Sequence, residues 1–206
     1  MSVAREQILR DIRQNLPVDE PLPELVGPWI RYDDPQAQFL EMLRAVGGAG
    51  KVIAGAGPLR NEIERLKEEL RAARICSVLP DVTTGNVALS LVDDPHQLAD
   101  VDLAILPGEL AVAENAAVWI TGAIVLQRVL YFLSQHVVLV VPAEQIVHNM
   151  HEAYEWLNHQ AGAPGPFAEA RWGAFMSGPS KTADIEQALV IGAHGARSLT
   201  VILLGE

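Results

Sequence analysis

The chain has 206 residues and a formal net charge of −11, with 50% hydrophobic and 20% charged residues. This composition fits one well-buried globular domain. The acidic balance argues against a protein that binds nucleic acid or an anionic membrane surface, because Lys and Arg are not clustered to offset it. The single cysteine, Cys76, rules out internal disulfides and thiolate metal clusters supplied by this chain alone. For this reason we expect a cytoplasmic protein. We expect no membrane span, since the apolar segments are interrupted by polar residues.

The first residues predict an amphipathic helix. Apolar residues recur there at helical spacing among charged ones: Ile8, Leu9, Ile12 and Leu16. Residues 17–28 contain four prolines and are typical of an extended linker. We therefore predict that residues 1–28 form a helix and linker, and that residues 29–206 form a single α/β domain. The apolar stripe of the helix needs a partner, so the helix could pack on a second subunit and form a homo-oligomer.

Strand-length and helix-length apolar patterns alternate through the rest of the chain. The Asp34-Pro35 pair has the form of a helix cap followed by a first-turn proline, and it predicts a helix start. We expect further helices at residues 58–71 and 143–160, and strands at residues 51–54, 74–79, 101–106, 137–141, 172–176 and 199–204. This alternation predicts an α/β fold, a three-layer α/β/α sandwich with a largely parallel sheet.

Two glycine-rich segments resemble nucleotide-binding motifs, but neither match is complete. Gly55 and Gly57 follow a predicted strand and precede a helix, yet Arg60 stands where a dinucleotide-binding fingerprint has its third glycine. Gly173 and Gly178 have the spacing of a P-loop, but the required lysine does not follow the second glycine directly. We interpret the first segment as a tight turn between strand and helix, and we predict neither a dinucleotide nor a nucleoside triphosphate site.

The most polar turn lies between the predicted strand at residues 172–176 and a predicted helix at residues 183–191. Its candidate binding residues are small, hydroxyl-bearing or positively charged: Ser177, Gly178, Ser180, Lys181 and Thr182. The first N–H groups of a helix have no intrahelical partner and attract anions, so we expect this turn to hold a phosphate or a carboxylate. Asp184 is a competing occupant, because its carboxylate could cap the helix and leave an ordinary helix start.

Glu114 is the candidate catalytic residue. It stands between two apolar runs, residues 111–113 and 116–120, so its carboxylate should be partly buried and should either find a donor or have a raised pKa. We place it with Asn115 at the carboxyl edge of the sheet, where it would share a pocket with Lys181. The alternative is a structural glutamate whose carboxylate is satisfied by a backbone turn.

The histidines occur in two settings. His136 stands before a predicted strand and His194 stands beside Gly195 after a predicted helix, so both are candidates for the binding site, or else turn histidines bonded to backbone. Three other histidines lie with two glutamates on one face of the helix at residues 143–160: His148, His151, His159, Glu152 and Glu155. This face has the pattern of a solvated surface, and since no H-E-x-x-H motif occurs we predict no metal site.

Together these motifs resemble the LUD-domain family, whose name abbreviates lactate utilisation, and in particular its stand-alone members of the lactate utilisation protein C type. The matching segments fall within residues 100–206: residues 113–119, 135–141, 177–186, 192–195 and 199–204. The resemblance implies a three-layer fold similar to sugar-phosphate isomerases, class I CoA transferases and formyltetrahydrofolate cyclo-ligase. It also implies a role beside iron–sulfur partner proteins in the oxidation of L-lactate to pyruvate.

No electron carrier is visible in the sequence, so we expect the chain to bind no cofactor alone and its partners to carry the iron–sulfur centres. The Glu114-Asn115 pair is also similar to the Ser-Glu-Asn-Gly segment of class I CoA transferases, in which the glutamate is the nucleophile. Here Ala116 replaces that glycine, and alanine tolerates a positive φ poorly. Three functions stay open: a lactate-utilisation component with a small-carboxylate or phosphate site, a stand-alone transferase or isomerase using Glu114, and a structural subunit with a vestigial site.

Overall fold

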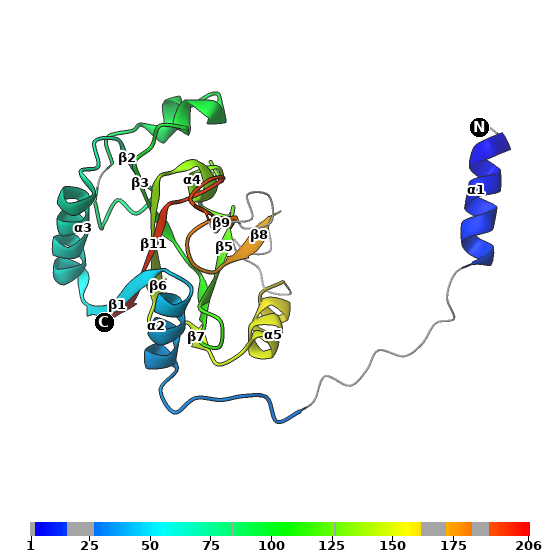
Figure 1. Ribbon diagram of the computed structural model, residues 1–206, viewed down its shortest axis with the longest axis horizontal. Coiled ribbons are helices and arrows are strands. Elements are labelled where there is room, and N and C mark those ends of the chain that lie inside the picture. The colour runs from blue at the N-terminus through cyan, green and yellow to red at the C-terminus, as the bar shows by residue number, and fades with distance from the viewer. Residues whose placement is uncertain (1–2, 16–26, 84, 126, 162–171, 183–189) are drawn as a thin grey trace.

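The computed structural model describes residues 3–15, 27–83, 85–125, 127–161, 172–182 and 190–206, and Figure 1 shows how its elements are arranged. The helices are α1 Val3–Gln14, α2 Pro35–Ala45, α3 Ala56–Leu70, α4 Leu130–Leu133 and α5 Met150–Ala161, with short 3-10 helices η1 Leu89–Leu91 and η2 Pro95–Leu98. The strands are β1 Ala49–Ala54, β2 Ile75–Ser77, β3 Leu103–Pro107, β4 Leu110–Val112, β5 Ala117–Thr121, β6 His136–Pro142, β7 Ile146–Val147, β8 Gly173–Met176, β9 Lys181–Thr182, β10 Val190–Ile191 and β11 Ser198–Gly205.

Five strands form the central sheet in the order β1-β11-β6-β3-β2, and every neighbouring pair is parallel. The inner strands β6 and β11 are nearly continuous runs of Val, Leu and Ile, as expected for a parallel sheet that is covered on both faces. The register aligns His136 with both Leu103 and Ser198, so β3, β6 and β11 begin at one edge and end at the opposite edge. The predicted α/β class with a parallel sheet is confirmed.

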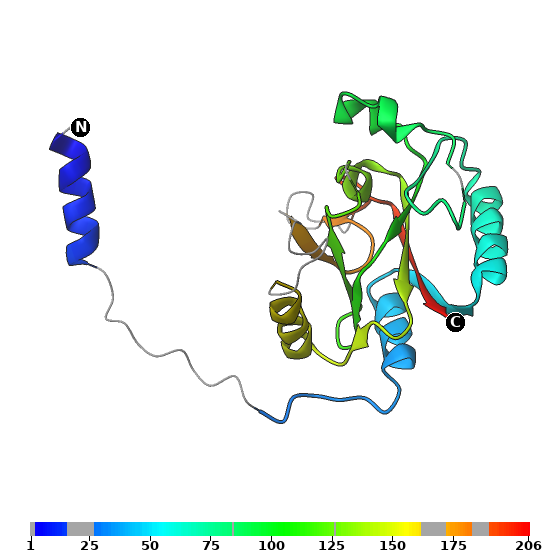
Figure 2. The ribbon, with the colours of Figure 1, turned by 180° about the vertical axis from the view of Figure 1, so that it is seen from behind.

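The two faces of the central sheet enter different cores. On β6, Val138 and Val140 pack toward α3, whereas Val137 and Leu139 face the other way. Three residues of α3, at helical spacing, are buried against the first face: Leu59, Ile63 and Leu66. The second face is covered by α2, by α4 and by a second sheet. Figure 2 shows α2 from behind, where it lies beside β1 and β7.

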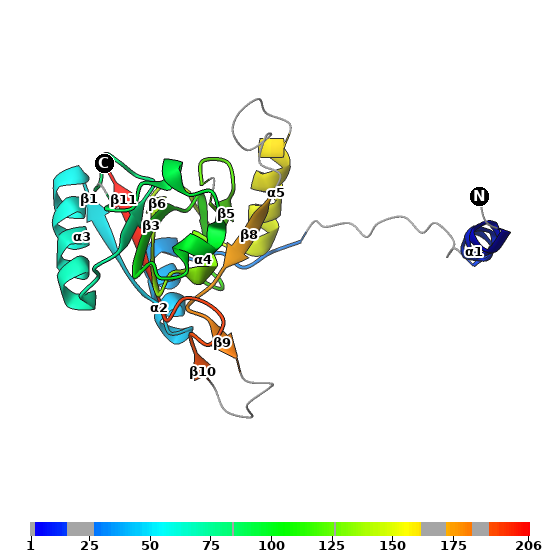
Figure 3. The ribbon, with the colours of Figure 1, turned by 90° about the horizontal axis from the view of Figure 1, so that it is seen from above.

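The second sheet has four strands in the order β7-β4-β5-β8, with β5 antiparallel to both of its neighbours. Its strands are apolar on both faces: Ala111, Val118 and Ile120 point toward the central sheet, while Leu110, Val112 and Ala117 pack with α5. Layers of α3, central sheet, second sheet and α5 therefore follow one another across the molecule (Figure 3). The predicted three-layer α/β/α arrangement is incomplete, because a doubly buried sheet separates the central sheet from α5.

Two predicted helices have different bounds or a different structure. The helix expected at residues 143–160 begins only at Met150, since Ile146 and Val147 form β7 beside β4. The prediction of a helix at residues 183–191 is wrong at residues 190–191, the end that the structure describes. There the β-branched Val190 and Ile191 form β10, which pairs with β9. Residues 183–189, with Asp184, lie outside the described residues.

The helix predicted near the start of the chain forms as α1, and none of its residues is buried. Its apolar side chains include Val3, Ile8 and Ile12, which are 84%, 58% and 54% exposed. The predicted cap of α2 is confirmed, because the Asp34 side chain accepts a hydrogen bond of 2.9 Å from the Ala37 N–H. Within the described residues no helix combines the length and the apolar character needed to cross a lipid bilayer.

We expect a methyl group added at Gly108 to lower the stability of the fold and one added at Gly57 to raise it. Gly108 joins β3 to β4, and a Cβ there would lie 2.4 Å from Val118 Cγ1 and 2.7 Å from Val141 Cγ2, which belong to different sheets. Gly108→Ala should therefore lower the free energy of unfolding by about 1–3 kcal/mol. Gly57 of α3 has open space around the same position, so Gly57→Ala should raise it by up to about 1 kcal/mol. Urea denaturation measures both, and equal effects would contradict the close packing of the two sheets.

Candidate functional site

Two of the predicted site segments meet in the structure. Strands β5 and β8 are antiparallel neighbours, so the turn before β5 lies beside the end of β8. The Ser177 hydroxyl, just after β8, donates a hydrogen bond of 2.7 Å to the Asn115 carbonyl. Ser177 itself is exposed. The polar turn after β8 and the Glu114-Asn115 turn after β4 therefore converge, because β4 and β8 lie on either side of β5 and both run antiparallel to it.

The chain then crosses the C-terminal end of α2. Gly178 has a φ of +73°, and a Cβ there would lie 2.8 Å from the Val46 carbonyl oxygen, so only glycine fits. Lys181 Nζ would lie 3.7 Å from a Cβ built on Gly47, which places the ammonium beside the end of α2. A cation is stabilised by the negative end of the helix dipole. Lys181 thus stands at the C-terminal end of α2, while the helix start predicted at residue 183 lies outside the described residues.

The segment continues to the edge where the central strands begin. The Ser180 N–H donates to the Ala196 carbonyl and the Ser180 carbonyl accepts from the Gly192 N–H, both at 2.9 Å. A Cβ on Gly195 would lie 3.0 Å from Ser180 Cβ, so glycine permits this close approach. On the neighbouring strand starts, His136 Nδ1 and Ser198 Oγ are 2.7 Å apart. His136, Ser180 and Gly195 are therefore brought to one edge, whereas His194 and Lys181 are exposed.

Arg197 is a residue that the sequence interpretation missed. It lies beside the loop of Gly192, where a Cβ would be 2.5 Å from Arg197 Cγ, and its N–H donates to the Gln135 carbonyl at 2.8 Å. Burial first, and then the charge of Arg197, lower the pKa of His136 below its ordinary 6.5, with Asp102 opposing them. The edge therefore presents a guanidinium, a neutral imidazole and hydroxyls, which can donate hydrogen bonds to a small anion.

Glu114 has a structural task in the same region. Its carboxylate Oε1 accepts a hydrogen bond of 2.8 Å from the Met150 N–H, the first of α5, and Asn149 accepts the Glu152 N–H at 3.0 Å. Both side chains satisfy helix N–H groups that have no intrahelical partner. The following Ala116 is buried and has a φ of +53°, the left-handed conformation that alanine tolerates poorly. This geometry matches the alternative in which Glu114 is satisfied by backbone.

The expected shared pocket of Glu114 and Lys181 is not apparent. Glu114 bonds to the start of α5, Lys181 lies beside the end of α2, and within the described residues no hydrogen bond or ion pair joins their side chains. The expected location at the carboxyl edge also needs correction. Glu114 and Ser177 follow strands of the mixed second sheet, to which the rule for parallel sheets does not apply, and His136 stands at the amino edge of the central sheet. The catalytic role of Glu114 stays a prediction.

Two histidines predicted to be solvated instead anchor the segment before α2. His148 Nδ1 accepts a hydrogen bond of 3.0 Å from the Tyr32 N–H, and the His151 ring stacks on Trp29 with centroids 3.5 Å apart. These partners lie more than a hundred residues away in sequence, so helical periodicity could not reveal them. Among the described residues, no three His, Cys, Asp or Glu side chains are grouped so as to hold a metal ion.

Comparison with known proteins adds a family match. Residues 92–204 match the family model described as the LUD domain. The chain is 30% identical over 113 residues to lactate utilization protein C of Geobacillus thermodenitrificans, covering 54% of this chain and 45% of that protein. The protein of the same name from Oceanobacillus iheyensis is 27% identical over 105 residues, covering 50% and 43%. The chain thus spans about half the length of the curated relatives it matches.

The fold also has a solved counterpart. A crystal structure of a DUF162 family protein from Deinococcus radiodurans superposes with a TM-score of 0.63, over 83% of this chain and 96% of that chain. At 19% sequence identity, this likeness concerns the fold alone. The counterpart supports an α/β architecture built on a five-stranded parallel sheet.

We expect Glu114 to contribute to stability through the start of α5. Glu114→Ala removes the acceptor of the Met150 N–H and should lower the free energy of unfolding by about 1–2 kcal/mol. Glu114→Gln keeps an acceptor oxygen and loses only the charge–dipole attraction, so it should cost about 0.3–1 kcal/mol. Chemical denaturation of both variants checks the order, and an alanine variant as stable as the wild type would contradict the capping role.

The lowered pKa of His136 predicts a pH dependence of stability. Above pH 6.5, its ordinary pKa, His136 is neutral in both the folded and the unfolded state. As the pH falls below this value the unfolded state takes up a proton before the folded state does, so stability should be lost progressively. His136→Asn keeps an acceptor near Ser198 Oγ but does not titrate, and it should flatten this loss. The exposed His159→Asn is the matched control, and the same flattening in both variants would contradict the assignment.

Proposed function

The chain belongs to the LUD-domain family, and on that premise we propose that it is a component of lactate utilisation. In this proposal it acts with iron–sulfur partner proteins in the oxidation of L-lactate to pyruvate. The support is the named relatives, lactate utilization protein C from three bacteria, although each alignment covers less than half of the relative. The redox centres would lie on the partners, because the chain has one cysteine, buried Cys76, and we propose that it binds no cofactor alone.

The contribution that we propose for this chain is a site for a small carboxylate or phosphate at the amino edge of the central sheet. One observation carries it: Ser180, in the segment after β8, bonds to the loop before β11, and Arg197 of that loop lies beside His136 and Ser198 at the starts of β6 and β11. A guanidinium binds a carboxylate through paired charge-assisted hydrogen bonds. Such a cation-lined edge is notable on a chain of net charge −11. Lys181 and Thr182 extend it outward.

The alternative is a stand-alone enzyme of the CoA-transferase or isomerase type that uses Glu114. It would require the chain to share the finer three-layer fold of those enzymes, and the five-stranded parallel sheet is compatible with that relation. The hydrogen bond from the Met150 N–H weighs against it, because a carboxylate that caps a helix is less free to attack a substrate. We therefore favour the lactate-utilisation component over the Glu114 enzyme, with a structural subunit as the remaining possibility.

Deletion of the gene in its own organism tests the role. The deletion strain should grow as the parent does on pyruvate but lose most of its growth on L-lactate, because only the oxidation step is removed. Wild-type protein should restore growth on L-lactate, and Arg197→Gln should restore it poorly. Arg71→Gln, which removes an exposed charge at the end of α3, is the matched control and should restore it fully.

The outcomes separate the two parts of the proposal. Undiminished growth of the deletion strain on L-lactate would contradict the role in lactate utilisation. If the deletion strain loses growth on L-lactate and Arg197→Gln restores it fully, the role in lactate utilisation is supported and the proposed anion site is contradicted. Poor restoration by both arginine variants would point to a general effect of charge and would also remove the site.

A further inference from the structure

The carboxyl edge of the central sheet, opposite the edge discussed above, contains a pocket of about 460 Å³. It is formed where four neighbouring strands end: β2 through Leu79 to Val82, β3 through Pro107 to Glu109, β6 through Val140 to Glu144, and β11 through Leu204 to Glu206. Ligands of parallel α/β sheets characteristically bind outside the carboxyl ends of the strands. The volume falls in the range of small-molecule sites.

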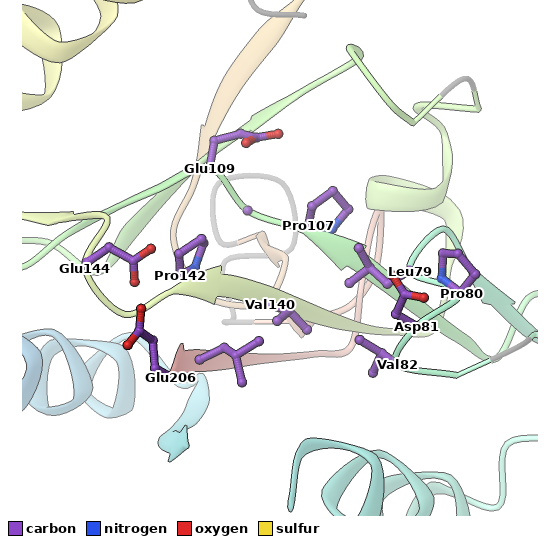
Figure 4. Close-up of a pocket in the computed structure, with 13 residues that line it drawn as sticks. Leu79, Pro80, Asp81, Val82, Pro107, Glu109, Val140, Pro142, Glu144 and Glu206 are labelled. Atoms are coloured by element: carbon purple, nitrogen blue, oxygen red, sulfur yellow. The ribbon is translucent and has the colours of Figure 1, made fainter. Parts of the chain in front are cut away.

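The walls of the pocket are mainly apolar, with carboxylates as the charged groups. Apolar side chains form most of the lining: Leu79, Pro80, Val82, Pro107, Val140, Pro142 and Leu204. Four acidic residues complete it, namely Asp81, Glu109, Glu144 and Glu206, and none of the described lining residues is Lys, Arg or His. Figure 4 shows Glu144 and Glu206 on one side of Val140, Asp81 on the other, and Glu109 beyond Pro142.

Hydrogen-bond donors are scarce in this lining. Three of its residues are prolines, which have no backbone N–H, and the N–H groups of Gly108 and Glu109 are already donated to Val140 and Trp119 carbonyls at 2.9 Å. The carboxylates are free acceptors, because no ion pair involves any of the four in the described part of the chain. A ligand that satisfies this lining must bring its own donors and an apolar body.

Of the four carboxylates, Glu109 would gain most from a hydrogen-bond donor or a positive charge on the ligand. It is half-buried, and burial raises its pKa above the usual range. Burial first, and then the nearby charge of Glu109, raise the pKa of the Tyr131 phenol. Tyr131 does not donate a hydrogen bond to the Glu109 carboxylate, because its hydroxyl donates to the Pro107 carbonyl at 3.2 Å. A positive ligand group beside Glu109 would compensate a carboxylate that the fold leaves desolvated and unpaired.

We propose that this pocket binds a small organic cation, a primary or secondary amine that carries an apolar chain, with its ammonium group beside Glu109 and its chain against Val140 and Leu204. A bare metal ion fits less well, since no three ligating side chains are grouped among the described residues. An anion such as a carboxylate is disfavoured by the four carboxylates. This site is therefore distinct from the proposed anion site and does not rest on the lactate-utilisation role.

Titration of the purified full chain with hexylammonium chloride tests the proposal against two analogues of equal chain length, 1-hexanol and sodium hexanoate. Calorimetry gives the affinities, and backbone amide NMR shifts locate the ligand. The amine should bind more tightly than both analogues and should shift the N–H signals of Val82, Gly108 and Leu204. Glu109→Gln, which keeps the side-chain volume, should weaken amine binding about tenfold or more, because it removes a charged hydrogen bond.

Glu68→Gln on the exposed side of α3 is the matched control, since it removes one carboxylate outside the pocket and should leave amine binding unchanged. The proposal is overturned by any of four results: no amine binding, equal affinity for hexanol or hexanoate, an unchanged affinity in Glu109→Gln, or shifts confined to residues away from the pocket. Equal weakening by both glutamine variants would show only an effect of net charge and would also overturn it.

Discussion

The close packing of the second sheet on the central sheet is the constraint on which the rest of the structure depends. The chain crosses from one sheet to the other at Gly108, where a Cβ would clash with valines of both sheets. Small side chains continue the contact, since Ala111, Ala113 and Ala116 are buried in the shared core. Protein interiors are packed nearly as densely as organic crystals, so this spacing leaves little room for larger residues. The strand ends that carry polar groups are placed by this packing.

One consequence is that different polar groups stand at the two edges of the central sheet. The amino edge presents the donors of Arg197, Ser180 and His136, whereas the carboxyl edge presents acceptors around Glu109. Strand β6 has seven residues and connects the two edges, so they are roughly 20 Å apart. At that distance salt screens one exposed charge from the other, and each edge can select its own ligand.

A second consequence concerns the start of α5, which is fixed by residues remote in sequence. Glu114 accepts the first N–H of the helix, Asn149 accepts the N–H of Glu152, and the Asn149 amide donates to the Ile30 carbonyl at 2.9 Å. The stacking of Trp29 on His151 adds to this junction. A partly buried carboxylate between apolar runs is therefore explained by packing and capping. Its burial alone does not require a catalytic role.

The sequence by itself determined the strands of the central sheet, the buried stripe of α3 and the cap at Asp34, because apolar periodicity and capping chemistry are local signals. It also identified the segments that resemble the LUD family and the convergence of Ser177 with the Glu114 turn. The tertiary structure alone decided that β4 and β5 join β7 and β8 in a second sheet and that Val190 and Ile191 pair with β9, since strand pairing joins residues distant in sequence. It likewise decided which side chains face one another. The partners of His148 and Glu114, the place of Arg197 beside His136 and the pocket around Glu109 all arise from packing between separate segments.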